Sequence, residues 1–129
     1  MNHLTKIKKI LANLLDIDAE EITADTYLIR ELDVESIDLL EIAVTLNSEF
    51  GVEIDDDAIF LKSLRIHLTG AEGSPLPLLL EKYPFLSKER LEEIIGDVAD
   101  GPVLRVKDLV SYIEWRAAGP PPLPTASRS

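Results

Sequence analysis

Apolar residues recur at helical spacing at the start of the chain. They stand three or four positions apart, at Leu4, Ile7, Leu11 and Leu14. Polar residues between them fall on the opposite side of the same helical wheel, which predicts an amphipathic helix over residues 3–15. The next twenty residues show no sustained period but keep apolar residues at intervals, at Ile17, Ile22, Tyr27, Leu28, Leu32 and Val34. We expect a long loop that is anchored to a core.

The helical period returns from Ser36 to Phe50. Gly51 follows, as expected at a helix C-terminus. Serine is among the residues favoured at the N-cap, so Ser36 is predicted to cap this helix. Three consecutive aspartates then precede Ala58, and their charge suits the positive end of a third, short helix containing IFLKSLRI.

Glycine and proline punctuate residues 69–105. Within this stretch PLPLLLEKY predicts a turn or two of helix, and Ser87 is placed to cap another helix that reaches about Ile95, with Gly96 behind it. A last amphipathic helix is expected from Val106 to about Arg116. The ending GPPPLPTASRS cannot bury enough apolar surface to fold. We therefore expect one domain over residues 1–117 and a disordered tail over 118–129.

Composition favours helices and argues against metal sites. The chain has 129 residues, of which 46% are hydrophobic but only 5% aromatic, so a core of Leu, Ile and Val is expected and the fold class is predicted to be all-α. No cysteine is present, which excludes disulfides, thiolate ligands and a cysteine nucleophile. An EF-hand loop starting at Asp16 would place Glu21 and Tyr27 where Gly and Glu are required. We expect no metal.

Charge is concentrated in one stretch of the chain. Residues 16–57 hold fifteen acidic residues and one basic residue, a net of −14, while the whole chain carries −11. Such a surface repels nucleic acid and anionic lipid but attracts basic protein surfaces. No apolar run is long enough for a membrane span or resembles a signal peptide, so we expect a cytoplasmic protein without a membrane span.

The hydroxyl of Ser36 has three possible roles: helix cap, catalytic nucleophile or attachment point. A nucleophile needs a nearby base and an oxyanion hole, yet Ser36 lies in VESID rather than GxSxG, and both histidines are far away in the sequence. Acidic residues at 35, 38 and 41 form a ridge along one side of the predicted helix. That ridge is either a solvated face or a surface for a basic partner.

The order of these elements, together with ELDVESIDLLEIAVTLNSEFGVEID, resembles the acyl carrier protein family. The similarity covers about Leu4 to Leu64 and Val106 to Trp115. This resemblance implies a four-helix bundle that carries acyl groups and is not itself an enzyme. It also implies that Ser36 receives 4′-phosphopantetheine from a phosphopantetheinyl transferase, and that the thiol of this group holds the acyl chain as a thioester.

The resemblance assigns further roles by position. Glu35 and Ile37 would lie beside the modified serine, as would Leu40. Basic surfaces of the transferase and of acyl-processing enzymes would contact Asp38, Glu41 and Glu49. The acyl chain would be sheltered among the apolar residues of the bundle interior, namely Leu39, Ile42, Ala43, Leu46, Phe50 and Ile54.

Three features depart from the usual family pattern. Glu35-Ser36-Ile37 replaces Asp-Ser-Leu, Arg105 stands where threonine commonly begins the last helix, and residues 67–104 form a helical insertion before that helix. The insertion either enlarges the acyl cavity or merely covers a helix. We expect a monomeric carrier of fatty acid or specialised lipid biosynthesis; an aminoacyl or polyketide carrier and an unmodified acidic adaptor are the alternatives.

Overall fold

The computed structural model describes residues 3–70 and 73–118. Its helices, in chain order, are α1 His3–Leu15, α2 Ser36–Phe50, α3 Asp56–Ile59, α4 Leu64–Gly70, α5 Leu76–Lys82, α6 Lys88–Asp97 and α7 Val106–Ala117. Two short 3₁₀ turns are η1, Ala19–Glu21, and η2, Val98–Asp100. Within the described ranges there is no β-strand, only one isolated bridge between Tyr27 and Arg105. The prediction of an all-α fold is confirmed.

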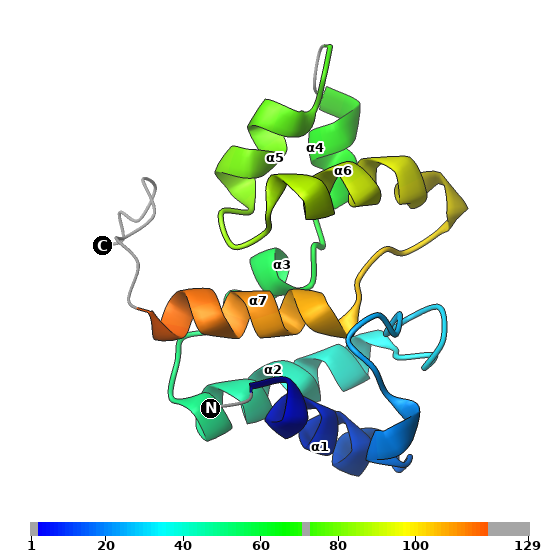
Figure 1. The fold of residues 1–129 in the computed structure, drawn as a ribbon, viewed down its shortest axis with the longest axis vertical. Coiled ribbons are helices and arrows are strands. Elements are labelled where there is room, and N and C mark those ends of the chain that lie inside the picture. The colour runs from blue at the N-terminus through cyan, green and yellow to red at the C-terminus, as the bar shows by residue number, and fades with distance from the viewer. Residues whose placement is uncertain (1–2, 71–72, 119–129) are drawn as a thin grey trace.

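The helices are arranged in two layers (Figure 1). Helices α1, α2 and α7 form one layer, α4, α5 and α6 form the other, and the short α3 lies between them. Helix α1 packs against both α2 and α7, and its periodic apolar residues Ile7, Ile10 and Leu11 are buried there. The predicted helix over residues 3–15 therefore forms with the predicted bounds and the predicted buried face.

The long loop before α2 is anchored to the core as expected. Ile22, Leu28 and Val34 are buried. The backbone N–H of Leu28 donates to the carbonyl of Leu104 at 3.0 Å, and the N–H of Val106 donates to the carbonyl of Thr26 at 3.0 Å. These bonds join the loop to the start of α7, although the two segments are far apart in the sequence.

The predicted third helix is wrong in one respect, because IFLKSLRI is divided between two helices. Helix α3 begins as expected, with the Asp55 carboxylate accepting from the N–H groups of Asp57 and Ala58. The chain then turns sharply at Leu61, whose φ is 56°. The Asp57 carboxylate closes this turn by accepting from the backbone N–H of Ser63 at 3.1 Å and from its hydroxyl at 2.9 Å. That interaction interrupts the helix, and α4 starts one residue later.

Helices α5, α6 and α7 form near the predicted positions. Ser87 caps α6 by accepting from the N–H of Arg90 at 3.0 Å. The prediction that Gly96 ends α6 is wrong, since the helix continues through it to Asp97. Gly101 instead has the positive φ, 133°, which a side chain rarely adopts. Of the predicted tail 118–129, residues 119–129 lie outside the described residues.

Residues 67–104, the predicted insertion, pack onto α7. Their buried apolar side chains are Leu79, Tyr83, Phe85, Leu86, Leu91, Ile94, Val103 and Leu104. The Phe85 ring lies 5.1 Å from the ring of Tyr112 and 5.9 Å from that of Trp115, measured between centroids. Helix α7 is therefore covered on two sides, by α1 and by this second layer.

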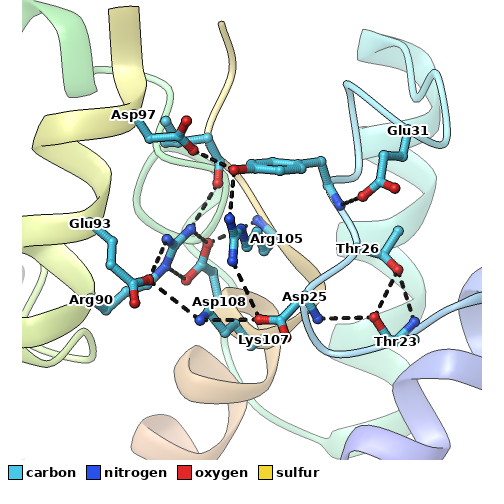
Figure 2. A network of polar contacts seen from close by, with 12 residues as sticks. Thr23, Asp25, Thr26, Glu31, Arg90, Glu93, Asp97, Arg105, Lys107 and Asp108 are labelled. Carbon is cyan, nitrogen blue, oxygen red and sulfur yellow. Dashed lines mark hydrogen bonds and ion pairs between the residues drawn. The ribbon is translucent and has the colours of Figure 1, made fainter. Parts of the chain in front are cut away.

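A buried ion pair fastens α6 to α7 (Figure 2). Nε and Nη2 of Arg90 donate to the two carboxylate oxygens of Asp108, each at 2.8 Å. Nη2 of Arg90 also donates to the carbonyl of Val103 at 2.8 Å. Asp108 accepts in addition from the backbone N–H of Arg105 at 2.9 Å, the N-cap position of α7. One carboxylate thus satisfies both the buried guanidinium and the start of the last helix.

Tyr83 on the second layer has a buried hydroxyl that finds no hydrogen-bond partner within the described residues. A buried unpaired hydroxyl costs stability, so Tyr83→Phe is expected to raise the free energy of unfolding at pH 7 by about 1 kcal/mol. Urea denaturation measures this. Tyr112→Phe is the matched control and should lower the free energy of unfolding. Its hydroxyl does have partners, because it donates to the Glu53 carbonyl and accepts from the Asp55 N–H.

The same residue also predicts a pH dependence. Burial, with a smaller contribution from the charge of Asp57, raises the pKa of Tyr83 to about 12. Because the folded state holds this proton more tightly than the unfolded chain, stability is lost as pH rises from about 10 to about 12, by roughly 2 to 3 kcal/mol. Tyr83→Phe should lack this loss. Equal alkaline slopes in the two proteins would contradict the prediction.

Candidate functional site

Ser36 occupies the first position of α2, and the structure gives the capping role to its neighbour. Glu35 is the N-cap residue, with extended backbone, and its N–H donates to the carboxylate of Asp38 at 2.9 Å. Asp38 at the third helical position thus satisfies the backbone just before the helix, as in a capping box. The prediction that Ser36 caps α2 is wrong, because Glu35 and Asp38 already do so.

The Ser36 side chain is therefore not needed by the helix that presents it. It is exposed, and no residue in 3–70 or 73–118 forms a hydrogen bond with its hydroxyl. Its neighbours Glu35 and Ile37 are also exposed, and Ile37 keeps 66% of its surface accessible. The hydroxyl is open to an enzyme approaching from solvent.

An apolar stripe continues from Ile37 along the exposed side of α2. Leu40 is 56% exposed and Val44 is 61% exposed. Together with Ile37 they follow helical spacing, so they share one face. These three large aliphatic side chains form an apolar strip on the surface of α2.

The three acidic residues predicted to face partners differ in their surroundings. Glu41 is exposed, and no other described residue pairs with it. Asp38 is half-buried and is held by the Glu35 N–H. Glu49 lies 3.7 Å from the ammonium of Lys6 on α1, which also donates to the Glu49 carbonyl at 3.0 Å. Glu41 is thus the most available of the three for a basic partner.

The residues predicted to shelter an acyl chain lie on the inner side of α2 and just beyond it. Four of them are buried: Leu39, Ile42, Ala43 and Leu46. Phe50 and Ile54 are partly buried, and Phe50 contacts the His3 ring at a centroid distance of 5.6 Å. Their assignment to a cargo site stays a prediction.

A pocket of about 220 Å³ opens beside the N-terminal half of α2. Of the predicted acyl-site residues it includes Leu39 alone, and its other apolar lining comes from segments that the sequence reasoning did not select: Ile29, Phe60, Leu61, Leu64, Val98 and Val103. Phe60, Leu61 and Leu64 belong to IFLKSLRI, and the apolar run from Ile59 to Leu61 was the available signal. Val98 and Val103 carried no signal, because only folding brings them beside Leu39.

Two kinds of site have no support in the part of the chain that the structure describes. Its Asp, Glu and His side chains form no group of three that could hold a metal ion. None of its helices is long and apolar enough to cross a membrane.

Comparison with known proteins gives a consistent family match. The model of the phosphopantetheine attachment site matches residues 5–65. The acyl carrier protein of Nitratidesulfovibrio vulgaris strain DP4 is 42% identical over 52 residues, which cover 40% of this chain and 68% of that protein. The acyl carrier protein of Lactobacillus acidophilus is 44% identical over 52 residues, covering 40% of this chain and 65% of that protein. No solved structure is significantly similar to the chain.

The matched region contains α1, the anchored loop, the whole of α2 and the turn after α3, whereas α5, α6 and α7 lie beyond it. The first of these relatives is matched over more than two thirds of its length. The chain therefore belongs to the acyl carrier protein family, whose members are carriers rather than enzymes and bear a covalently attached 4′-phosphopantetheine.

Proposed function

We propose that this protein holds acyl intermediates as thioesters on a 4′-phosphopantetheine arm attached to Ser36, in fatty acid or specialised lipid biosynthesis. The observation that carries the proposal is the state of the Ser36 hydroxyl. It is exposed, unbonded and not used as a cap, and it lies within the segment that matches the phosphopantetheine attachment site. Because the fold uses no hydrogen bond of the Ser36 hydroxyl, this hydroxyl is available for modification.

The surroundings of Ser36 fit a phosphodiester. Ser36 begins a helix of 15 residues, and the first N–H groups of a helix together with its dipole favour an anion. The nearby carboxylates would oppose that anion, but Glu35 and Glu41 are exposed, so water screens them. When bound, the group supplies a reactive thiol, which this cysteine-free chain lacks. Glu35 and Ile37 would flank the attachment point.

The exposed side of α2 supports the proposed partners. Ile37, Leu40 and Val44 form an apolar strip, and Glu41 lies beside it on the same helix. An apolar centre with a charged rim is typical of protein interfaces. We infer that basic surfaces of the transferase and of acyl-processing enzymes bind here, with Asp38 and Glu49 contributing at the edge.

The test of this function is intact-protein mass spectrometry of the wild-type chain. After incubation with coenzyme A and a transferase of broad specificity, we expect the mass to increase by one phosphopantetheine group. With acyl-coenzyme A as donor, the increase should include the acyl group. A carrier from the matched family serves as the positive control. A wild-type chain that stays unmodified while the control is converted would overturn the proposal and favour an unmodified adaptor.

A further inference from the structure

The pocket beside α2 has two walls that come from different parts of the chain. One wall belongs to the matched region and contains Leu39 of α2 together with the turn between α3 and α4. The opposite wall is made by residues 98–104, the connection from α6 to α7, which lies outside the matched region. We call residues 98–104 the outer wall. Figure 1 shows this connection running from the second layer down to the start of α7.

The outer wall is fastened at its first residues by two arginines of the matched region. Arg65 donates to the carbonyl of Val98 at 3.1 Å. Arg30 donates to the carbonyls of Asp97 and Gly101 at 3.0 and 3.1 Å, and pairs with the Asp97 carboxylate at 3.2 Å. Because these bonds go to backbone carbonyls at both ends of η2, they fix the path of the chain rather than a single side chain.

Hydrogen bonds also hold the last residues of the outer wall, Val103 and Leu104. Arg90 donates to the carbonyl of Val103, and the N–H of Leu28 donates to the carbonyl of Leu104. Val103 and Leu104 are 4% and 2% exposed, so their side chains belong to the core rather than to a loose loop. A ligand in the pocket would meet a wall that is preformed.

Tyr27 strengthens this attachment from the loop before α2. Its ring lies between two guanidinium groups, with Arg30 at 4.2 Å and Arg105 at 4.4 Å from the ring centroid. Its hydroxyl donates to Asp97 at 2.5 Å and accepts from Arg105 at 2.6 Å. Arg105 therefore serves to join the wall, the loop and α7.

The position of the pocket suits cargo that is tethered at Ser36. Leu39 lies three residues after Ser36 on the same helix, so the pocket begins about one helical turn from the attachment point. Two cations, Lys62 and Arg65, also line it, and they carry the charge opposite to that of a phosphodiester. The remaining lining is mainly aliphatic, which favours a hydrocarbon chain.

The volume limits how much of a chain the pocket can cover. At about 220 Å³ it equals the liquid volume of on the order of seven water molecules. Because the pocket is open to solvent on one side, this volume suits a medium-length acyl chain of about the size of octanoyl.

Resting on the proposed attachment at Ser36, we propose that the outer wall selects cargo length in this protein. The acyl chain lies between Leu39, the turn after α3 and the outer wall, and Val98 and Val103 close the pocket. Straight chains up to about octanoyl are covered, and longer chains protrude. The outer wall thus gives the segment beyond the family match a defined role, whereas a segment that merely covered α7 would not affect cargo.

The test compares thermal stability across a series of acyl groups. The 129-residue chain is loaded with acetyl, butyryl, hexanoyl, octanoyl, decanoyl and palmitoyl arms, and the unfolding midpoint of each form is measured. In the wild type the midpoint should rise up to octanoyl and then level off. Val98→Ala should move the plateau to decanoyl, and Val98→Phe should move it to butyryl. Ile66→Phe is the matched control, since Ile66 is 72% exposed and does not line the pocket; it should leave the profile unchanged.

Two readouts keep the result interpretable. Unfolding midpoints of the unloaded variants show whether each variant folds. In nuclear magnetic resonance spectra, attaching the octanoyl arm should shift the signals of Leu39, Val98 and Val103 more than those of other residues. Shifts confined to Ile42, Leu46 and Ile54 would overturn the proposal by placing the chain in the bundle interior. So would equal profiles in wild type and both Val98 variants. Failure to attach the arm at all would instead refute the proposed function, which separates the two ideas.

Discussion

Replacing Ser36 by alanine is expected to abolish phosphopantetheine attachment completely while leaving the fold unchanged. The loss follows because the reacting hydroxyl is removed. The fold should persist because Glu35 and Asp38, not Ser36, cap α2, and alanine is the best helix former. Intact mass after incubation with coenzyme A and transferase should show no gain, and the unfolding midpoint should stay within about 2 °C of the wild type.

Two further variants make the Ser36 result specific. Ser48→Ala changes another exposed serine of the same helix and should be modified as fully as the wild type. Asp38→Ala removes the acceptor of the Glu35 N–H and should cost about 1 kcal/mol of stability, the usual value of a cap. If Ser36→Ala also lost about 1 kcal/mol, the capping assignment would be wrong. If it retained the mass gain, the attachment point would be elsewhere.

Removing one partner of the buried Arg90–Asp108 ion pair should give the largest loss of stability in the molecule. Arg90 is 6% exposed and Asp108 is fully buried, so Asp108→Ala leaves a guanidinium in the interior with only the half-exposed Glu93 carboxylate as a counter-ion. Such a change typically costs about 3 to 5 kcal/mol. Asp108→Ala also deprives the Arg105 N–H of its acceptor at the start of α7. Since small domains are stable by only about 5 to 15 kcal/mol, the second layer should detach or the protein unfold.

Chemical denaturation with guanidinium chloride checks this expectation, and the structure offers a matched control. Glu93 also pairs with Arg90, at 3.2 Å, but its side chain is 54% exposed. Glu93→Gln should therefore cost less than about 1 kcal/mol. The double variant Arg90→Met with Asp108→Leu removes both charges and should recover much of the lost stability. An Asp108→Ala protein as stable as Glu93→Gln would show that the ion pair does not hold the layers together.

Much of this fold could be read from the sequence because its signals are local. The helices at residues 3–15 and 36–50 were predicted with their observed bounds, and Ser87 was predicted as the cap of α6. Helical periodicity and cap residues act over three or four positions, so they are visible in one dimension. The attachment motif around Ser36 is local as well, which is why the family could be identified from it.

Where local signals competed, the sequence could not decide between them. Ser36 was the predicted cap, and the outcome depended on Asp38 reaching back to the Glu35 N–H. The division of IFLKSLRI depended on the Asp57 carboxylate accepting from Ser63 rather than leaving the helix to continue. In each case a short side chain made a backbone bond that ended or started a helix, an alternative that propensity alone does not rank.

The sequence by itself determined most of the helices, the acidic stretch and the motif around Ser36, since each depends on residues that are neighbours along the chain. Only the tertiary structure decided which distant segments meet. It brought Val98 and Val103 to Leu39, placed Tyr27 between Arg30 and Arg105, and paired Arg90 with Asp108. These contacts join residues far apart in sequence, and they form only when burial of apolar surface offsets the entropy lost in closing the intervening loops.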